Sequence, residues 1–195
     1  MKNTAIILTL VVALGALLIV VKYVYRPSGD SENLQNSSPT KIQPTIGSSM
    51  KIQSSAFSNN GQIPSKFTCD GENINPPLTF SDIPTNAQGL VLIVDDPDAP
   101  AGTWTHWLVW NIPPDTLSIS ENSTPQNAVQ GTTSFGKNEY GGPCPPSGTH
   151  RYFFKLFALD TKLDISSSSN VSDLEAEMKG HILGNTQLVG TYSKR

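Results

Sequence analysis

Three observations predict a mainly β (α+β) fold with a few short helices. Apolar and polar residues alternate in runs such as 104–112 and 149–159, which is the pattern of half-buried strands. Clusters of Pro, Gly, Asn and Asp separate these runs, as turns separate strands. One segment, near residues 173–183, has helical spacing instead. These features lie in residues 51–195, which have the length of one domain.

Local patterns predict the individual elements. Ser172 and Glu175 have the spacing of a capping box, and Leu174 and Met178 recur at helical spacing, so a helix is expected over 173–183. Residues 113–148 are rich in loop-forming residues, and a loop of that size is more often functional than idle. The predicted strands are, in chain order, residues 51–57, 77–80, 90–94, 104–112, 149–159 and 187–192.

Residues 1–25 are predicted to be an N-terminal transmembrane anchor. Residues 4–21 are uncharged and mostly apolar, and as a helix they would span about 27 Å, close to the thickness of a bilayer. A cleaved signal peptide is the alternative, but the small-x-small site at 13–15 is followed by more apolar residues. No cysteine lies near this segment, which excludes a lipoprotein. We therefore expect a membrane-anchored protein whose domain lies on the extracytoplasmic side.

Residues 26–50 are predicted to be a flexible polar linker, because their Pro, Ser, Asn, Gln and Thr residues cannot bury enough apolar surface to fold. Residues 51–195 contain nine Lys and Arg against fourteen Asp and Glu, a formal charge of −5. This charge argues against nucleic-acid binding, which needs a basic surface. It also argues against electrostatic adhesion to an anionic membrane.

Two polar motifs contain two of the three histidines, and each joins a Pro/Gly-rich bend to a predicted strand. The first runs from Asp95-Asp96-Pro97-Asp98-Ala99-Pro100 to Trp104-Thr105-His106-Trp107. The second is Gly142-Pro143-Cys144-Pro145-Pro146 followed by His150-Arg151-Tyr152. At such points a buried sheet can present side chains to a ligand.

Strict alternation groups each of these histidines with apolar residues on one face of its strand. The two faces are Trp104, His106, Leu108 and Trp110 in the first strand, and His150, Tyr152, Phe154, Leu156 and Ala158 in the second. A polar mouth above an apolar floor is typical of a small-ligand pocket. The sequence does not show that the two strands are neighbours.

At these motifs the sequence resembles the phosphatidylethanolamine-binding proteins (PEBPs), also called Raf-kinase-inhibitor-like proteins, and is most similar to their bacterial and archaeal branch. The resemblance extends over roughly residues 51–195, including 67–71 and 188–192. Two separated motifs that contain Pro, Trp and His in order indicate this family much more specifically than one short pattern would. The resemblance implies a large antiparallel sheet packed with a smaller sheet and a few short helices.

The resemblance also implies a preformed pocket for a small anionic or phosphate-bearing ligand, such as a phosphorylethanolamine head group. The residues that match the family's anion-binding positions are Asp96, His106, His150 and Tyr152. We expect both histidines and the tyrosine to donate hydrogen bonds to the anion, and the aspartate to orient a histidine or receive an amine. Trp104 matches a wall residue of that pocket, and we expect Pro100 and Pro146 to stiffen its rim.

Three acids stand close together at positions 95, 96 and 98, and their repulsion predicts a cationic or hydrogen-bonding partner for at least one of them. We expect Arg151 to pair with Asp98 as a structural tie between the two motifs. Cys69 and Cys144, the only cysteines, could form a disulfide if the domain lies outside the cytoplasm, and would be free thiols otherwise.

Other functions use the same residues. An Asp with two His is also the composition of a metal site, although no HExxH or Cys-rich cluster accompanies it. An acid–base enzyme built on Asp96 and His106 is a third interpretation, but the G-x-S-x-G elbow of a serine nucleophile is absent. The family includes inhibitors of kinases and serine proteases, so the main alternative is a protein-interaction regulator acting through the pocket rim and the 113–148 loop. We expect a binding protein with no cofactor and no bound metal, and not an enzyme.

Overall fold

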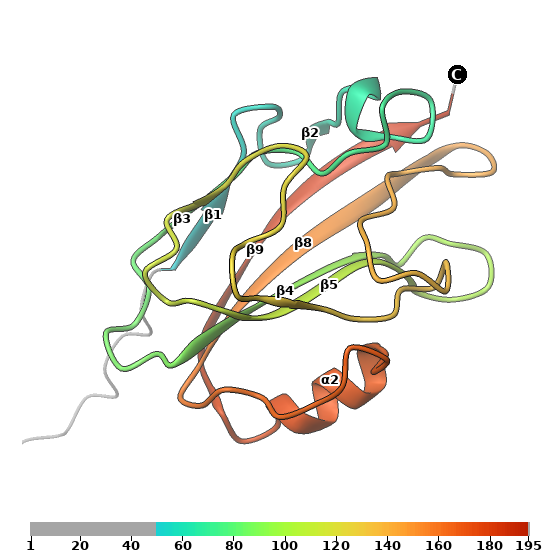
Figure 1. The fold of residues 1–195 in the computed structure, drawn as a ribbon. Coiled ribbons are helices and arrows are strands. Elements are labelled where there is room, and N and C mark those ends of the chain that lie inside the picture. Colours follow the sequence, from blue (N-terminus) through green and yellow to red (C-terminus); the bar gives the residue numbers. More distant parts are fainter. Residues whose placement is uncertain (1–49, 195) are drawn as a thin grey trace, which may run out of the picture. The chain divides into compact units, whose positions relative to one another are not determined.

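A six-stranded sheet is the central layer of the protein, whose computed structural model describes residues 50–194. The strand order is β2-β9-β8-β4-β5-β7. Figure 1 labels these strands except the two-residue β7. All neighbouring strands are antiparallel except β2 and β9, which are parallel. The strands are β2 (Gly61–Gln62), β4 (Gly89–Asp96), β5 (Trp104–Ile112), β7 (Val129–Gln130), β8 (Thr149–Leu159) and β9 (Ile182–Ser193).

A smaller antiparallel sheet packs on one face of the large sheet. It consists of β1 (Lys51–Gln53), β3 (Leu78–Ser81) and β6 (Ser118–Ile119), in the order β1-β3-β6. Apolar side chains of both sheets fill the space between them and are almost fully buried, among them Ile52, Phe80, Leu92 and Phe154. The predicted fold class, mainly β with a large and a smaller sheet, is confirmed.

The helix α2 (Val171–Met178) covers the other face of the large sheet, beside β4 and β5 (Figure 1). Its buried residues are Leu174 and Met178, the two that helical spacing predicted. The capping box is formed by Asn170 and Asp173 instead of Ser172 and Glu175, so the helix begins earlier than predicted and ends at residue 178. One 3-10 helix, η1 (Ser65–Phe67), precedes β3.

Strand β9 begins at Ile182, five residues before the predicted start. Gly184 and Asn185 have the composition of a turn, but they pair with Ala158 and Phe157 of β8. Pairing with a long neighbouring strand satisfies their backbone groups, and this outweighs a weak local preference. Strands β5 and β8 have the predicted bounds.

A β-bulge interrupts β5 beside the first motif. Val94 of β4 pairs with Trp107, but the next residue, Asp95, pairs with Thr105, so His106 has no partner on β4. An extra residue of this kind bends a strand and changes the direction in which its side chains point. Bulges are common next to functional sites, where they aim a side chain.

The bulge separates His106 from the residues with which strict alternation had grouped it. Leu108 and Trp110 belong to the core under α2. The His106 ring instead contacts the ring of Tyr152, which belongs to the core between the two sheets. The predicted apolar floor of His106 is therefore wrong, because the bulge places this histidine on the face that carries Tyr152.

The predicted membrane anchor and the predicted location are corrected here. No helix within residues 50–194 is long and apolar enough to cross a bilayer. The segment predicted as the anchor, residues 1–25, and the predicted linker, residues 26–50, lie outside the described residues except for Met50. We therefore assign neither a transmembrane helix nor a membrane location to the protein.

Candidate functional site

A buried pair of Asp96 and His150 lies at the centre of the candidate site. Asp96 is the last residue of β4 and His150 the second residue of the adjacent strand β8, so sheet pairing brings them together. Oδ2 of Asp96 is 2.7 Å from Nδ1 of His150. The two residues are only 3% and 7% exposed. Oδ1 of Asp96 accepts the backbone N–H of Asp98 at 2.8 Å, the local turn that an Asp favours before Pro.

The Asp96 carboxylate determines how the His150 ring is presented. A carboxylate oxygen accepts hydrogen bonds, so Nδ1 of His150 donates its hydrogen to Asp96. This interaction holds the ring in one orientation and leaves Nε2 for a ligand.

His106 is held in a different way, by the loop that precedes the second motif. Its Nδ1 lies 2.6 Å from the carbonyl oxygen of Gly141, which can only accept, so Nδ1 carries the hydrogen. Burial lowers the pKa of His106 and outweighs the opposing effects of the Gly141 carbonyl and the Asp96 charge. The neutral ring therefore offers Nε2 as a hydrogen-bond acceptor.

Tyr152 contributes a buried hydroxyl to this cluster. Its ring meets the His106 ring edge to face, with 5.2 Å between centroids. The hydroxyl oxygen is buried and forms no hydrogen bond within residues 50–194, although Asp96 and the backbone of Cys144 lie near it. Burial, and next the Asp96 charge, raises the pKa of Tyr152 far above its ordinary value. A protonated, buried hydroxyl without a partner is uncommon and marks a place where a ligand atom or water can bind.

Aromatic residues stand beside the cluster. Trp104 is half-buried, and its ring lies 5.5 Å from the ring of Phe135, which also lies 5.3 Å from the ring of His106. Pro100 and Pro146 are both exposed, in the loops that adjoin the cluster, and their role in the rim stays a prediction.

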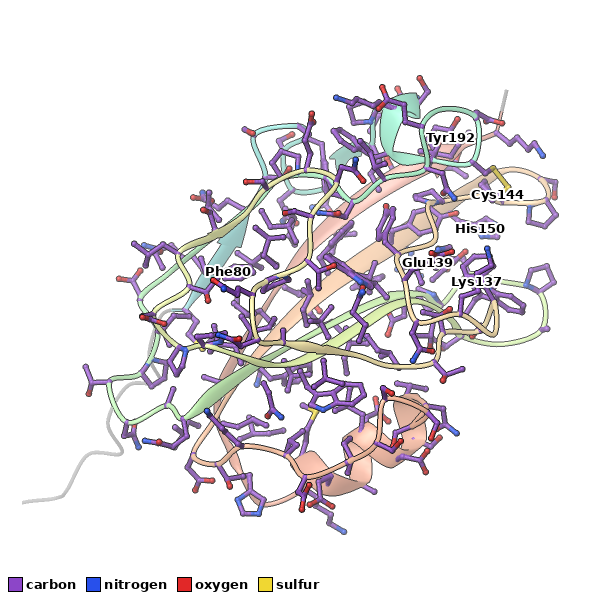
Figure 2. All side chains as sticks on the ribbon, viewed as in Figure 1. Phe80, Lys137, Glu139, Cys144, His150 and Tyr192 are labelled. Atoms are coloured by element: carbon purple, nitrogen blue, oxygen red, sulfur yellow. A yellow bond between two sulfur atoms is a disulfide. The ribbon has the colours of Figure 1, made fainter. Side chains whose placement is uncertain are left out.

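Four links connect residues 140–144, which include the start of the second motif, to residues 67–73. One is a disulfide between Cys69 and Cys144, visible as the yellow bond at Cys144 in Figure 2. The others are hydrogen bonds: Tyr140 Oη to the Phe67 carbonyl (3.0 Å), the Gly142 N–H to Asn73 Oδ1 (2.7 Å), and the Cys69 N–H to the Pro143 carbonyl (3.1 Å). These links hold the backbone next to Tyr152 in place.

The two motifs are also joined by Asp98 and Arg151. Nε and Nη2 of Arg151 donate to the two carboxylate oxygens of Asp98 at 2.9 and 2.7 Å, and the Arg151 N–H adds a third bond at 2.9 Å. The hydrogen bonds from the arginine side chain lower the pKa of Asp98 to about 2. The pair therefore ties the loop after β4 to the start of β8.

Comparison with known proteins shows which family has this architecture and these motifs. The family model described as phosphatidylethanolamine-binding protein matches residues 53–193, which include the large sheet, α2, both motifs and all of the smaller sheet except the first two residues of β1. The chain belongs to the phosphatidylethanolamine-binding protein family.

Relatives and solved PEBP structures agree with this assignment. A UPF0098 protein of Methanothermobacter thermautotrophicus is 49% identical over 150 residues, which are 74% of this chain and 99% of that protein. A UPF0098 protein of Pyrococcus horikoshii is 46% identical, over 75% of this chain and 78% of its own. The crystal structure of a PEBP homolog from Chlamydia trachomatis has a TM-score of 0.73 and 42% identity, over 76% of this chain and 99% of that one. The crystal structure of E. coli YbcL, described as a new member of the mammalian PEBP family, has a TM-score of 0.71 and 29% identity. The match covers 75% of this chain and 99% of YbcL.

Sequence reasoning missed two residues at this candidate site, Phe135 and Gly141. Phe135 lies in the long loop, and its ring contacts both Trp104 and His106. The Gly141 carbonyl fixes the His106 ring, and a Cβ at Gly141 would come within 2.4 Å of the Phe135 ring. The adjacent pair Gly141-Gly142 was the available signal, since two glycines together often mark a close approach of the backbone to another group.

The metal interpretation gains no support from the geometry. Within residues 50–194, no group of three or more His, Cys, Asp or Glu side chains is arranged to hold a metal ion. The residues that the structure does bring together form a hydrogen-bonding cluster, and the family is one of binding proteins.

Proposed function

We propose that this PEBP binds a small phosphate-bearing anion at the cluster of Asp96, His106, His150 and Tyr152. The family description names phosphatidylethanolamine, so a phosphorylethanolamine head group is the first ligand to test. Trp104 would form a wall of the pocket, and Pro100 and Pro146 its rim.

The Tyr152 hydroxyl is the observation that carries this proposal. It is buried and protonated, and it makes no hydrogen bond of good geometry within the described residues, although the Asp96 carboxylate lies near it. Leaving such a group unpaired costs about 1–3 kcal/mol, which an accepting oxygen on a ligand would recover. The neighbouring His150 has its Nδ1 committed to Asp96 and so offers Nε2 on a ring whose orientation is fixed.

The geometry favours a different role for His106 from the one expected from sequence. Its N–H is already donated to Gly141, and its lowered pKa keeps the ring neutral. His106 would therefore accept a hydrogen bond through Nε2, from a protonated phosphate oxygen or from an ammonium group. His150 and Tyr152 would remain the groups that face the anion.

Calorimetric titration of the purified full-length chain with phosphate and with phosphorylethanolamine tests the proposal. We expect saturable binding that is lost in His150→Ala and weakened about tenfold in Tyr152→Phe, which removes one hydrogen bond and keeps the ring. Tyr192→Phe is the matched control, because the Tyr192 hydroxyl already bonds Asp70 at 2.6 Å. Absence of binding to wild type, or equal binding by Tyr152→Phe, would overturn the proposal.

The second candidate is a regulator that binds another protein through the 113–148 loop. Among the described residues, the large hydrophobic side chains that are exposed are Leu117, Phe135 and Ile182, and two of the three lie in this loop. Single exposed apolar residues are ordinary, but two in one loop fit an interaction surface. Phe135 lies beside the rings of Trp104 and His106, and Leu117 lies next to β3 of the smaller sheet.

Inhibition assays against serine proteases and kinases test this candidate. Inhibition that is weakened by Leu117→Ser and unaffected by Ile182→Ser would support it, since Ile182 is 45% exposed at the start of β9, outside the loop. Inhibition that both variants retain, or no inhibition of any enzyme, would argue against it.

A further inference from the structure

A cavity of about 280 Å³ lies beside the proposed anion site and is not lined by Asp96, His150 or Tyr152. We call it the side cavity. Figure 2 labels three residues that line it, Lys137, Glu139 and Cys144. The rest of its wall includes Phe135, Tyr140, and the adjacent pair Gly141-Gly142.

The wall of the side cavity offers few free hydrogen-bonding groups. The Tyr140 hydroxyl donates to Phe67, Asn73 Oδ1 accepts from Gly142, and Thr133 Oγ1 donates to the Lys137 carbonyl. The aromatic rings, the disulfide, the glycine backbone and the paired side chains of Lys137 and Glu139 form the remaining surface. Because these polar atoms are already paired inside the protein, an occupant would gain free energy mainly by burying apolar surface.

Two residues, Phe135 and Gly141, belong to both the side cavity and the anion site. The Phe135 ring lines the cavity and also lies against the rings of His106 and Trp104. Gly141 lines the cavity, and its carbonyl holds the His106 ring. A group attached to an anion bound near His106 would therefore lie next to the side cavity.

The mouth of the side cavity carries an ion pair. Nζ of Lys137 lies 3.1 Å from Oε1 of Glu139, and both side chains are more than 60% exposed. These residues can be replaced without disturbing the core, which makes the mouth suitable for a blocking substitution.

We infer that the side cavity receives a compact apolar substituent carried by the anion. The ligand class is then a singly substituted phosphate whose substituent is an aromatic ring or a short branched alkyl group. This inference rests on the proposed anion site. Size supports it, since apolar cavities of roughly 150 Å³ hold benzene and the side cavity is larger.

Titration of the full-length chain with inorganic phosphate, phenyl phosphate and phosphorylethanolamine tests the inference. We expect phenyl phosphate to bind at least roughly tenfold more tightly than the other two, from burial of one ring. Glu139→Trp should remove that advantage by filling the mouth while leaving phosphate binding unchanged. Glu139→Gln is the matched control, because it also breaks the ion pair with Lys137 but adds no volume, and it should keep the advantage.

The outcomes separate this inference from the proposed function. If phosphate binds and phenyl phosphate binds no more tightly, the side cavity is not a ligand compartment and the anion site stands. If the advantage persists in Glu139→Trp, the ring lies elsewhere and the inference is overturned. If neither anion binds wild type, the anion site fails and the inference fails with it. Nuclear Overhauser contacts from phenyl protons to the rings of Phe135 and Tyr140 would locate the substituent directly.

Discussion

Asp95 and Asp96 are consecutive residues of β4 that face opposite sides of the large sheet and pair with different residues of β8. Asp96 bonds His150 at 2.7 Å on the side of the candidate site. Asp95 Oδ2 lies 2.5 Å from Nζ of Lys155 on the other side. Each charge therefore has its own partner, which relieves the repulsion that the sequence predicts between these acids.

Lys155→Met is expected to destabilise the fold at neutral pH. Asp95 is buried, and its Oδ1 has no hydrogen-bond partner within the described residues. Removing Lys155 would leave this carboxylate without a counter-charge, at a cost of up to about 3 kcal/mol because the lysine is itself one-third exposed. Urea denaturation at pH 7 measures this loss.

The pH dependence of that variant provides the control. Burial raises the pKa of Asp95, so the folded state binds a proton more readily than the unfolded state and this group favours folding as pH falls. The loss in free energy of unfolding caused by Lys155→Met should therefore shrink from pH 7 towards pH 4. The double variant Asp95→Asn/Lys155→Met has no buried charge at position 95 and should show little of this loss. A penalty that is the same at both pH values would contradict the assignment.

Arg151→Lys is expected to lower stability slightly and to change its dependence on acid. The arginine holds the pKa of Asp98 at about 2, below its ordinary 3.8. The lowered pKa stabilises the folded state. This contribution to the free energy of unfolding is fully present above pH 4 and is lost as pH falls towards 2, because the unfolded state takes up the proton first. A lysine cannot bond both oxygens, so the variant should lose less stability between pH 4 and pH 2. The effect is small because Arg151 is 55% exposed, and identical acid denaturation of the two proteins would show that the pair contributes nothing.

His106→Asn should remove a pH dependence near neutrality. The asparagine amide can donate to the Gly141 carbonyl, as Nδ1 of His106 does, but it does not titrate. Since burial lowers the pKa of His106, the unfolded state protonates first, and this group reduces stability progressively below about pH 6.5. One proton that is bound only by the unfolded state changes the free energy of unfolding by at most about 1.4 kcal/mol per pH unit.

Urea denaturation of wild type and His106→Asn between pH 8 and pH 5 measures this difference. We expect the wild-type stability to fall more steeply below about pH 6.5 than that of the variant. Parallel curves would show that His106 binds protons equally in both states.

Reduction of the Cys69–Cys144 disulfide is expected to destabilise the protein by about 2–4 kcal/mol, because the bond closes a long loop of the unfolded chain. Guanidinium denaturation with and without a reducing agent tests this, and the variant with both cysteines replaced by serine should be insensitive to the reductant. Three hydrogen bonds between the same segments remain after reduction, so we expect the native fold to persist. Equal stability under both conditions would contradict the prediction.

Period-two alternation was reliable where a strand pairs without interruption. In β8 it correctly placed Tyr152, Phe154 and Leu156 in the core between the sheets. It failed in β5, where the bulge inserts His106, because alternation describes one strand and a bulge is a property of two paired strands. Phe135 was missed for a related reason, since a loop residue carries no periodic signal.

The sequence by itself determined the mainly β class, the family and the two motifs, because alternation and short motifs are local and depend only on neighbours in the chain. Only the tertiary structure decided the partners: Asp96 with His150, Lys155 with Asp95, and the Gly141 carbonyl with His106. These contacts join residues 35 to 60 positions apart. They depend on strand order, register and one bulge, which long-range packing selects and local sequence does not encode.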